Sequence, residues 1–446
     1  MSDESILPFL SQFDPPEQAE GSLDPLGLYS IADALGVRLA PGVRERQSKP
    51  RYLTLALVGM AACGDDLVAT GQSKRIPAWL VYEWLVVESL VRQFRGTPSL
   101  QGIPGRDKVL STLDAGDVVC MRTYLKTPTV FGFHGIYRVL GVKAGLFDAA
   151  ANPLDQGYRV LSAWQADQGL AGFLEGEGQG PGHEFRRAIE RAVRSGLEAG
   201  HTRDPGARLR GLIADHLGPR NPGPKERDAL WEALTHNDPL RGEYARLLTS
   251  QQGQAAWLKS GGSEAAFQMW LAPHASLPMQ QLLKTIRSFE RLARLLTDAF
   301  DEVRFRMTEE RAPVDRNWLG SGGAMTLAGK GCLAAYEDAV DDLGEIDPGL
   351  RTRAERAFAW VGEVTSSASF AIHLLEHHER VQKAKPPNGK RAWFDTFGDG
   401  RVAIRPAYTA TEFVAQPEAY VQAYRTKPIW SFACDLQRVA VQVTNS

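Results

Sequence analysis

The strongest constraint on the fold is a long apolar stripe at helical spacing between Met279 and Met307. Its members recur every three or four positions: Leu282, Ile286, Phe289, Ala293, Leu296, Phe300 and Val303. Residues at this spacing share one side of an α-helix, so the pattern predicts one long helix with a buried face. Similar patterns over 52–63, 77–94 and 183–197 predict further helices. The chain is therefore expected to be mainly helical.

The stretch after the first two core helices mixes short helical and strand-like patterns. Helices are predicted over 106–113 and 132–140, and a short strand over 118–121. Two strand-like runs, 145–147 and 158–161, are joined by turn-forming residues and predict a hairpin. A helix followed directly by a hairpin is the order of elements in a winged helix. We therefore predict a mainly α protein with small β hairpins (α+β), a helical multidomain protein with a winged-helix-like unit.

The length of 446 residues exceeds one ordinary core, so two to four domains are expected. A glycine-rich segment over 172–182 is the clearest linker. The predicted division is a flexible lead-in over 1–22, a helical plus winged-helix-like domain over 23–171, a helical domain over 183–385, and a C-terminal α+β segment over 386–446 that packs on the helical body.

Several sequence features indicate a cytoplasmic protein. The four cysteines, Cys63, Cys120, Cys332 and Cys434, form no CxxC pair, which argues against a disulfide framework or a cysteine-based zinc site. The lead-in carries acidic residues and prolines instead of a basic segment followed by an apolar core, so no secretory signal is predicted. The most apolar run, 76–94, contains charges that would be costly in a bilayer, which favours a buried helix.

Local excesses of basic residues indicate contacts with nucleic acid. In the winged-helix interpretation, the helix beginning near Gly132 would enter a major groove and the hairpin would touch the adjacent backbone. The residues that would supply the positive charge are Arg122, Lys126, Arg138, Lys143 and Arg159. Lys390 and Arg391 flank a second hairpin predicted over 393–404. A plain structural role for both hairpins is the alternative.

A further basic stretch runs from Arg186 to Arg227, where ten lysines and arginines stand against five acidic residues. Nearly all of the ten are arginines, which suit bidentate phosphate contacts better than lysines do. A solvated helix face is the competing interpretation.

The histidines cluster at His373-Leu374-Leu375-Glu376-His377, which matches the H-x-x-E-H pattern of inverted zincins. On a helix, His373 and His377 could ligate zinc while Glu376 polarises a water molecule. The chemistry also needs a third ligand, and nothing in the sequence identifies one. Around the helix, His378 falls within the apolar face and the other two histidines fall at its margin. We therefore expect a core histidine at 378, and no catalytic residue or metal ligand.

One family resemblance is carried by short runs in about the first third of the chain: Asp24-Pro25-Leu26-Gly27, Pro41-Gly42, Arg51-Tyr52-Leu53-Thr54, Leu125-Lys126-Thr127-Pro128 and Phe131-Gly132-Phe133-His134-Gly135. In these runs the chain resembles an uncharacterised bacterial family encoded in antiphage defence gene clusters beside helicases and nucleases. The resemblance implies a non-enzymatic subunit of a defence assembly, and it transfers no catalytic residue.

The combined prediction is a non-enzymatic DNA-contacting or adaptor subunit of a bacterial antiphage defence complex. Its expected partners are other protein subunits of the defence system and double-stranded DNA, without a membrane or a cofactor. Two alternatives remain open. One is a zinc-dependent hydrolase that uses the inverted HxxEH motif, and the other is a protein-binding scaffold without nucleic acid.

Overall fold

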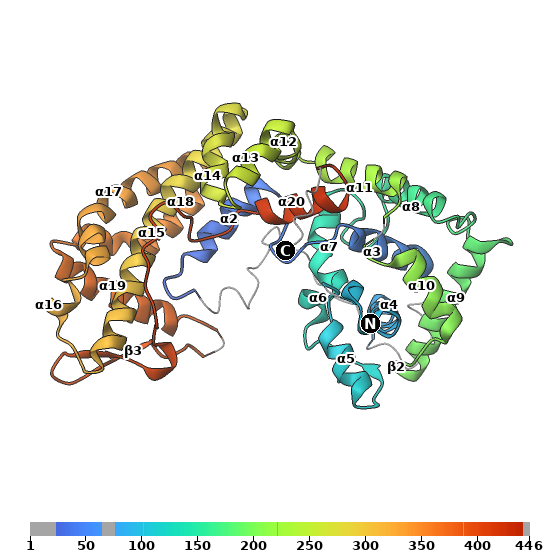
Figure 1. Cartoon of the computed structure of the whole chain (residues 1–446), viewed down its shortest axis with the longest axis horizontal. Coiled ribbons are helices and arrows are strands. Elements are labelled where there is room, and N and C mark those ends of the chain that lie inside the picture. Colours follow the sequence, from blue (N-terminus) through green and yellow to red (C-terminus); the bar gives the residue numbers. More distant parts are fainter. Residues whose placement is uncertain (1–23, 65–75, 101, 221, 387, 440–446) are drawn as a thin grey trace, which may run out of the picture. The chain divides into compact units, whose positions relative to one another are not determined.

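The computed structural model describes residues 24–64, 76–100, 102–220, 222–386 and 388–439. The lead-in predicted over 1–22 lies outside these residues. The chain forms two compact units, and each is assembled from two separate stretches of sequence (Figure 1). The first unit contains Met1–Leu39 and Gln251–Tyr424, and the second contains Ala40–Ser250 and Arg425–Ser446.

The first unit is helical with one small hairpin. Its described elements are α2 (Tyr29–Leu39), α13 (Gln251–Lys259), α14 (Glu264–Leu271), η3 (Ala272–His274), α15 (Leu277–Glu310), α16 (Arg316–Leu319), α17 (Gly323–Ile346), α18 (Pro348–Phe358), η4 (Ala359–Glu363), α19 (Ser367–Lys383), β3 (Phe394–Thr396), β4 (Val402–Ile404) and η5 (Pro406–Tyr408). Helix α15 packs lengthwise against α17, and α19 packs on both of them. Their shared apolar faces form the core of this unit.

The predicted long helix is confirmed by α15. The seven apolar residues of its stripe are all buried, as the helical spacing requires. The predicted C-terminal hairpin is also confirmed, because β3 and β4 pair antiparallel with Phe394 opposite Ile404. Val314 forms an isolated bridge to Val402, which ties this hairpin to the segment that follows α15.

The second unit is also helical. Its described elements are α3 (Arg51–Ala62), α4 (Ala78–Phe94), η2 (Pro98–Leu100), α5 (Arg106–Asp114), β1 (Val119–Cys120), α6 (Pro128–Phe131), α7 (Phe133–Lys143), α8 (Asp155–Asp167), α9 (Pro181–Ala199), β2 (His201–Thr202), α10 (Ala207–Leu217), α11 (Pro224–His236), α12 (Pro239–Thr249) and α20 (Thr426–Asp435). Helix α4 is buried along most of its length and contacts α5, α9 and α10. It is the central helix of this unit.

The winged-helix interpretation fails at its hairpin. The helices predicted over 106–113 and 132–140 are present as α5 and α7, and the short strand is present as β1. The run 158–161, however, lies inside helix α8, and Phe147 forms only an isolated bridge with Pro153. Buried Gly157, Val160, Leu161 and Trp164 follow the helical period, so tertiary packing selects a helix where the short run Tyr158-Arg159-Val160-Leu161 suggested a strand.

The two compact units begin and end at other points than the predicted domains. The glycine-rich segment 172–182 lies within the second unit, and the segment predicted as 386–446 contributes to both units. The segments 24–39 and 425–439 each pack with residues far away in the sequence, and local composition cannot reveal such long-range packing. The division into separately folding domains stays a prediction. No described helix is both long enough and apolar enough to cross a membrane.

Candidate nucleic-acid interface

The basic residues predicted around the winged helix lie on several elements of the second unit. Three are engaged within the protein. Arg122 pairs with Asp117 at 3.0 Å, Arg159 pairs with Glu232 at 3.5 Å, and Arg138 donates to the Ala149 carbonyl at 2.6 Å. Lys126 and Lys143 are exposed and form no ion pair with any described residue. None of the five lines any of the three pockets described below.

Lys390 and Arg391 do meet other charged residues, in the first unit. They line a pocket of about 680 Å³ between α19 and the β3–β4 hairpin, together with Glu376, Glu379 and Lys383. Arg391 pairs with Asp395 at 3.2 Å, and Lys383 pairs with Glu379 at 2.7 Å. Acidic and basic side chains balance in this pocket, so its geometry gives an anionic ligand little electrostatic preference.

The histidine cluster is a packing feature of α19. His378 is fully buried, as predicted, and its ring contacts the Pro25 carbonyl at 2.8 Å and the Trp393 amide at 3.0 Å. His377 was expected at the margin of the apolar face, but it is buried as well, and its Nε2 lies 2.8 Å from the Leu26 carbonyl oxygen. Burial lowers the pKa of each ring to about 4, so both are neutral near pH 7.

This arrangement removes the geometric support for a zinc pair. His377 is buried against the Leu26 carbonyl, and His373 lies beside Glu376 with 3.7 Å between Nδ1 and Oε2. Within the described residues, no group of three His, Cys, Asp or Glu side chains is placed to hold a metal ion. The backbone carbonyls of Pro25 and Leu26 explain why histidines occupy these positions.

A different site, a groove between α9 and α10, emerges from the second unit. Both helices pack extensively on α4 and only slightly on each other. The space left between them has a volume of about 1020 Å³, and Leu85 of α4 and Phe185 of α9 line it. We call it the arginine groove, because four arginines line it: Arg187, Arg191, Arg203 and Arg208. All four side chains are exposed.

The charges in the arginine groove do not cancel. Arg208 pairs with Glu184 at 3.4 Å across the groove. Arg187, Arg191 and Arg203 form no ion pair or side-chain hydrogen bond with any residue that the structure describes. The second acid in the lining, Asp204, is neutralised by Arg210 at 2.7 Å. Three guanidinium groups therefore remain available to an anionic ligand.

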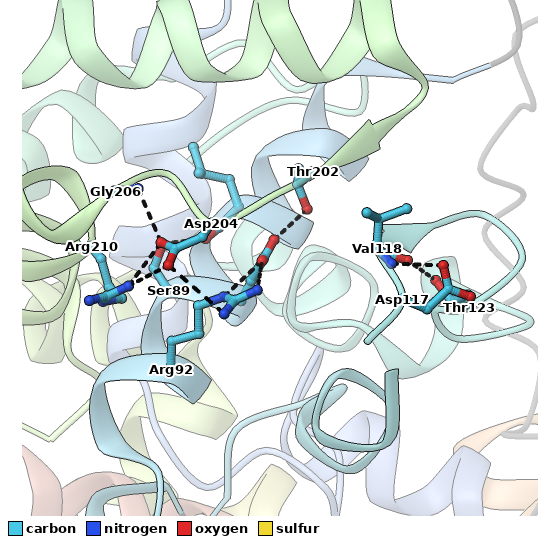
Figure 2. Close-up of polar contacts among 11 residues, drawn as sticks. Ser89, Arg92, Asp117, Val118, Thr123, Thr202, Asp204, Gly206 and Arg210 are labelled. Atoms are coloured by element: carbon cyan, nitrogen blue, oxygen red, sulfur yellow. Dashed lines mark hydrogen bonds and ion pairs between the residues drawn. The ribbon is translucent and has the colours of Figure 1, made fainter. Parts of the chain in front are cut away.

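A polar network that runs from buried Glu88 and Thr202 to exposed Asp204 holds the end of the arginine groove in place. Figure 2 shows Asp204 with dashed lines to Arg210, Arg92 and the Gly206 amide. Glu88, buried on α4, accepts from the Thr202 hydroxyl at 2.8 Å and from Arg92 Nε at 2.9 Å. These bonds fix the segment between α9 and α10, which carries Arg203. Arg203 therefore projects from an ordered segment.

The predicted residue Arg122 is connected to this same end of the groove. Strand β1 pairs antiparallel with β2, with Cys120 opposite His201, and His201 lines the groove. The turn that follows β1 carries Arg122, and it is closed by a bond from the Thr123 hydroxyl to the Val118 carbonyl at 2.7 Å (Figure 2). Arg122, one of the basic residues predicted from the sequence, is thus connected through β1 and β2 to the arginine groove, which was not predicted.

The C-terminal end of α10 is held by side chains from the core. The His216 carbonyl accepts from Arg51 Nη2 and from Trp164 Nε1, each at 2.9 Å. These donors satisfy a carbonyl that the helix end leaves without an intrahelical partner. The His216 ring lines the groove beside Phe185, with 5.4 Å between ring centroids, and burial lowers its pKa. A neutral aromatic ring thus faces the ligand space.

The groove residues were missed as a set because their grouping depends on tertiary packing. The sequence did signal them through the arginine excess from 186 to 227, but a solvated face explained that excess equally well. Only the packing of α9 and α10 on the same central helix separates the arginines that line the groove from those that do not.

Comparisons with known proteins add no further constraint. No protein-family model, curated protein or solved structure was found to match this chain.

Proposed function

We propose that this protein is a non-enzymatic, DNA-contacting subunit of a bacterial antiphage defence complex. The observation that carries the DNA contact is the arginine groove, where Arg187, Arg191 and Arg203 are exposed without acidic partners among the described residues. The guanidinium group of arginine can donate two hydrogen bonds to the oxygens of one phosphate. Phosphate contacts in turn dominate the affinity of most DNA-binding proteins. The defence assignment rests on the family resemblance of the first third of the chain.

The test is a binding titration with the purified protein. Labelled single-stranded and duplex DNA are titrated at several salt concentrations, and the affinity is expected to fall steeply with salt. Charge reversal at Arg187 and Arg191 is expected to weaken binding and to lower the salt slope by about 1 for each lost phosphate contact. Charge reversal at Arg138 and Lys143 asks whether the predicted α7 surface also contributes. Absent or salt-independent binding of both DNA forms contradicts the proposal.

A protein-binding scaffold is the second candidate, and one observation favours it. An apolar pocket of about 530 Å³ in the first unit, between α14, α15 and α17, is lined by the exposed side chains of Met269 and Leu327. Exposed apolar side chains grouped in this way are typical of contact sites for other proteins. Isolation of a stable protein complex that carries no nucleic acid would favour the scaffold over the DNA-contacting role.

A further inference from the structure

The arginine groove offers two chemically different surfaces to a ligand. Its rim carries guanidinium groups, whereas the lining between α9 and α10 includes the partly exposed side chains of Ala188, Ala192, Leu209 and Leu212. A duplex keeps its bases stacked inside and presents phosphates, so it would use only the rim. A single strand exposes the faces of its bases as well as its phosphates. It could therefore occupy both surfaces at once.

The spacing of the rim arginines suits a strand that runs along α9. Arg187 and Arg191 are four residues apart, so they lie on the same face of the helix and about 6 Å apart along its axis. This rise is comparable to the separation of successive phosphates along one nucleic-acid strand. Arg203 and Arg208, from the segment after β2 and from α10, line the groove as well.

The His216 ring supplies an aromatic surface near the C-terminal end of α10. It lies against Phe185, is partly exposed, and its Nδ1 is 3.3 Å from the Gln168 side-chain oxygen. Histidine is among the rings on which unstacked bases are bound. A ring held in this way is oriented before a ligand arrives.

We propose that the arginine groove binds single-stranded nucleic acid, with phosphates on Arg187, Arg191 and Arg203 and a base against the His216 ring. This inference rests on the proposed function and specifies its ligand. The competing occupant is an acidic helix of a partner protein. Arginine at all four basic rim positions, together with a ring in the lining, favours the nucleic acid because both phosphates and bases are matched.

The first experiment compares two arginines on the same helix. Fluorescence anisotropy measures binding of a labelled oligothymidylate of about 12 nucleotides, which is within the site sizes of single-strand-binding folds, and of a duplex of equal length. Arg191→Glu is expected to weaken single-strand binding about tenfold or more, and to reduce the salt slope by about 0.7 per lost phosphate contact. The matched control is Arg194→Glu, which makes the same charge change at an exposed α9 residue outside the groove. It is expected to change the affinity about twofold or less.

The second experiment tests the ring. His216→Ala is expected to weaken single-strand binding about tenfold, which is the typical effect of removing one stacking platform. His216→Phe retains an aromatic ring and is expected to restore most of the affinity. A merely structural role for His216 would make both variants behave alike. Circular dichroism and thermal unfolding check that each variant is folded.

The outcomes separate this inference from the proposed function. Tighter binding of the single strand than of the duplex, lost in Arg191→Glu and retained in Arg194→Glu, supports the inference. Duplex binding that equals or exceeds single-strand binding, with Arg191→Glu unaffected, overturns the inference and leaves DNA contact in place. Failure to bind either DNA at low salt overturns both. Binding of an acidic helical peptide in place of DNA assigns the groove to a protein partner and also overturns the inference.

Discussion

At the scale of single residues, Glu83 shows how one buried side chain can organise a helix start. It lies on α4 and accepts from the Tyr124 hydroxyl at 2.8 Å and from the His134 amide, at the first turn of α7, at 2.9 Å. A carboxyl group at this point accepts from an amide that the helix leaves without an intrahelical partner. Gly132 permits the approach, because a Cβ there would lie 1.9 Å from Glu83 Oε1.

Glu83 gives the first prediction, which concerns pH. Burial raises the pKa of Glu83 to about 7, so between its ordinary value and pH 7 the folded protein holds a proton that the unfolded chain has released. The stabilisation that Glu83 protonation gives to the folded protein is therefore fully present at low pH. As pH rises to about 7, the free energy of unfolding falls by roughly 3 kcal/mol at most. We expect Glu83→Gln to remove this slope. Hydrogen exchange of α4 and α7 between pH 5 and 8 measures it.

His134 also changes the stability of the protein with pH, so the effect of Glu83 must be measured as a difference between the parent protein and Glu83→Gln. Burial lowers its pKa to about 4, so its contribution rises with pH over part of the same window. The quantity to follow is the difference in stability between the parent protein and Glu83→Gln, which should shrink as pH rises. Glu232→Gln, at an exposed residue paired with Arg159, serves as the control. A difference that is constant with pH would contradict the raised pKa of Glu83.

At the scale of elements, the packing of α9 on α4 fixes one wall of the arginine groove. Gly196 is a point of close approach, because a Cβ there would lie 2.5 Å from Val81 Cγ1. Valine is stiff about χ1 and is fully buried here, so it cannot move aside freely. The absence of a side chain at 196 thus sets the distance between the two helices.

The second prediction tests this contact. Gly196→Ala should push α9 away from α4 and lower the free energy of unfolding by about 1–3 kcal/mol, the usual effect of overpacking a core. Gly211→Ala on α10 is the matched control, because no atom lies within 4 Å of a Cβ built there. That change should be neutral or stabilising by about 0.5–1 kcal/mol. Urea denaturation of the two variants measures both effects, and equal effects would refute the packing argument.

The elements also show what the sequence could predict. Long helices such as α15 could be predicted from the sequence, because a long apolar stripe at helical spacing by itself requires a helix with a buried face. The run 158–161 was misread because so short a run fits a strand or a helix, and only the packing of Trp164 and its neighbours decides between them. The burial of His378 was predicted correctly from helix geometry. The burial of His377 was not, because the Leu26 carbonyl that it contacts lies just before α2, far from α19 in the sequence. The arginine excess over 186–227 was visible in the sequence, but the groove was not, since α9 and α10 are brought together mainly by their packing on α4.

At the scale of the whole molecule, each compact unit is completed by a segment from the opposite end of the chain. In the second unit this segment includes α20. Thr426 bonds to the Tyr244 hydroxyl at 2.6 Å, the Ser431 hydroxyl donates to the Ser48 carbonyl at 2.9 Å, and Asp435 pairs with Lys49. These bonds join α20 to α12 and to the segment that precedes α3.

The third prediction concerns removal of this segment. A chain that ends at Tyr424 loses the buried Tyr244–Thr426 bond and uncovers apolar surface, so the second unit should unfold more readily. Hydrogen exchange should show lost protection in α12 and at the start of α3, while α15 in the first unit keeps its protection. Equal loss of protection in α12 and α15 would mean that the truncation acts on the whole chain instead of on one unit.

The interleaved chain course also bears on how this protein reaches its folded state during synthesis. Helix α2 is made early, but α15 and α18, on which it packs, are translated only after nearly all of the second unit. The second unit cannot complete its packing until α20 has been made, and α20 lies near the end of the described chain. Contacts between such distant segments are slow to form, so α2 emerges without its partners and the main part of the second unit emerges before α20 can pack on it. We therefore expect the nascent chain to depend on chaperones until α20 has docked on the second unit.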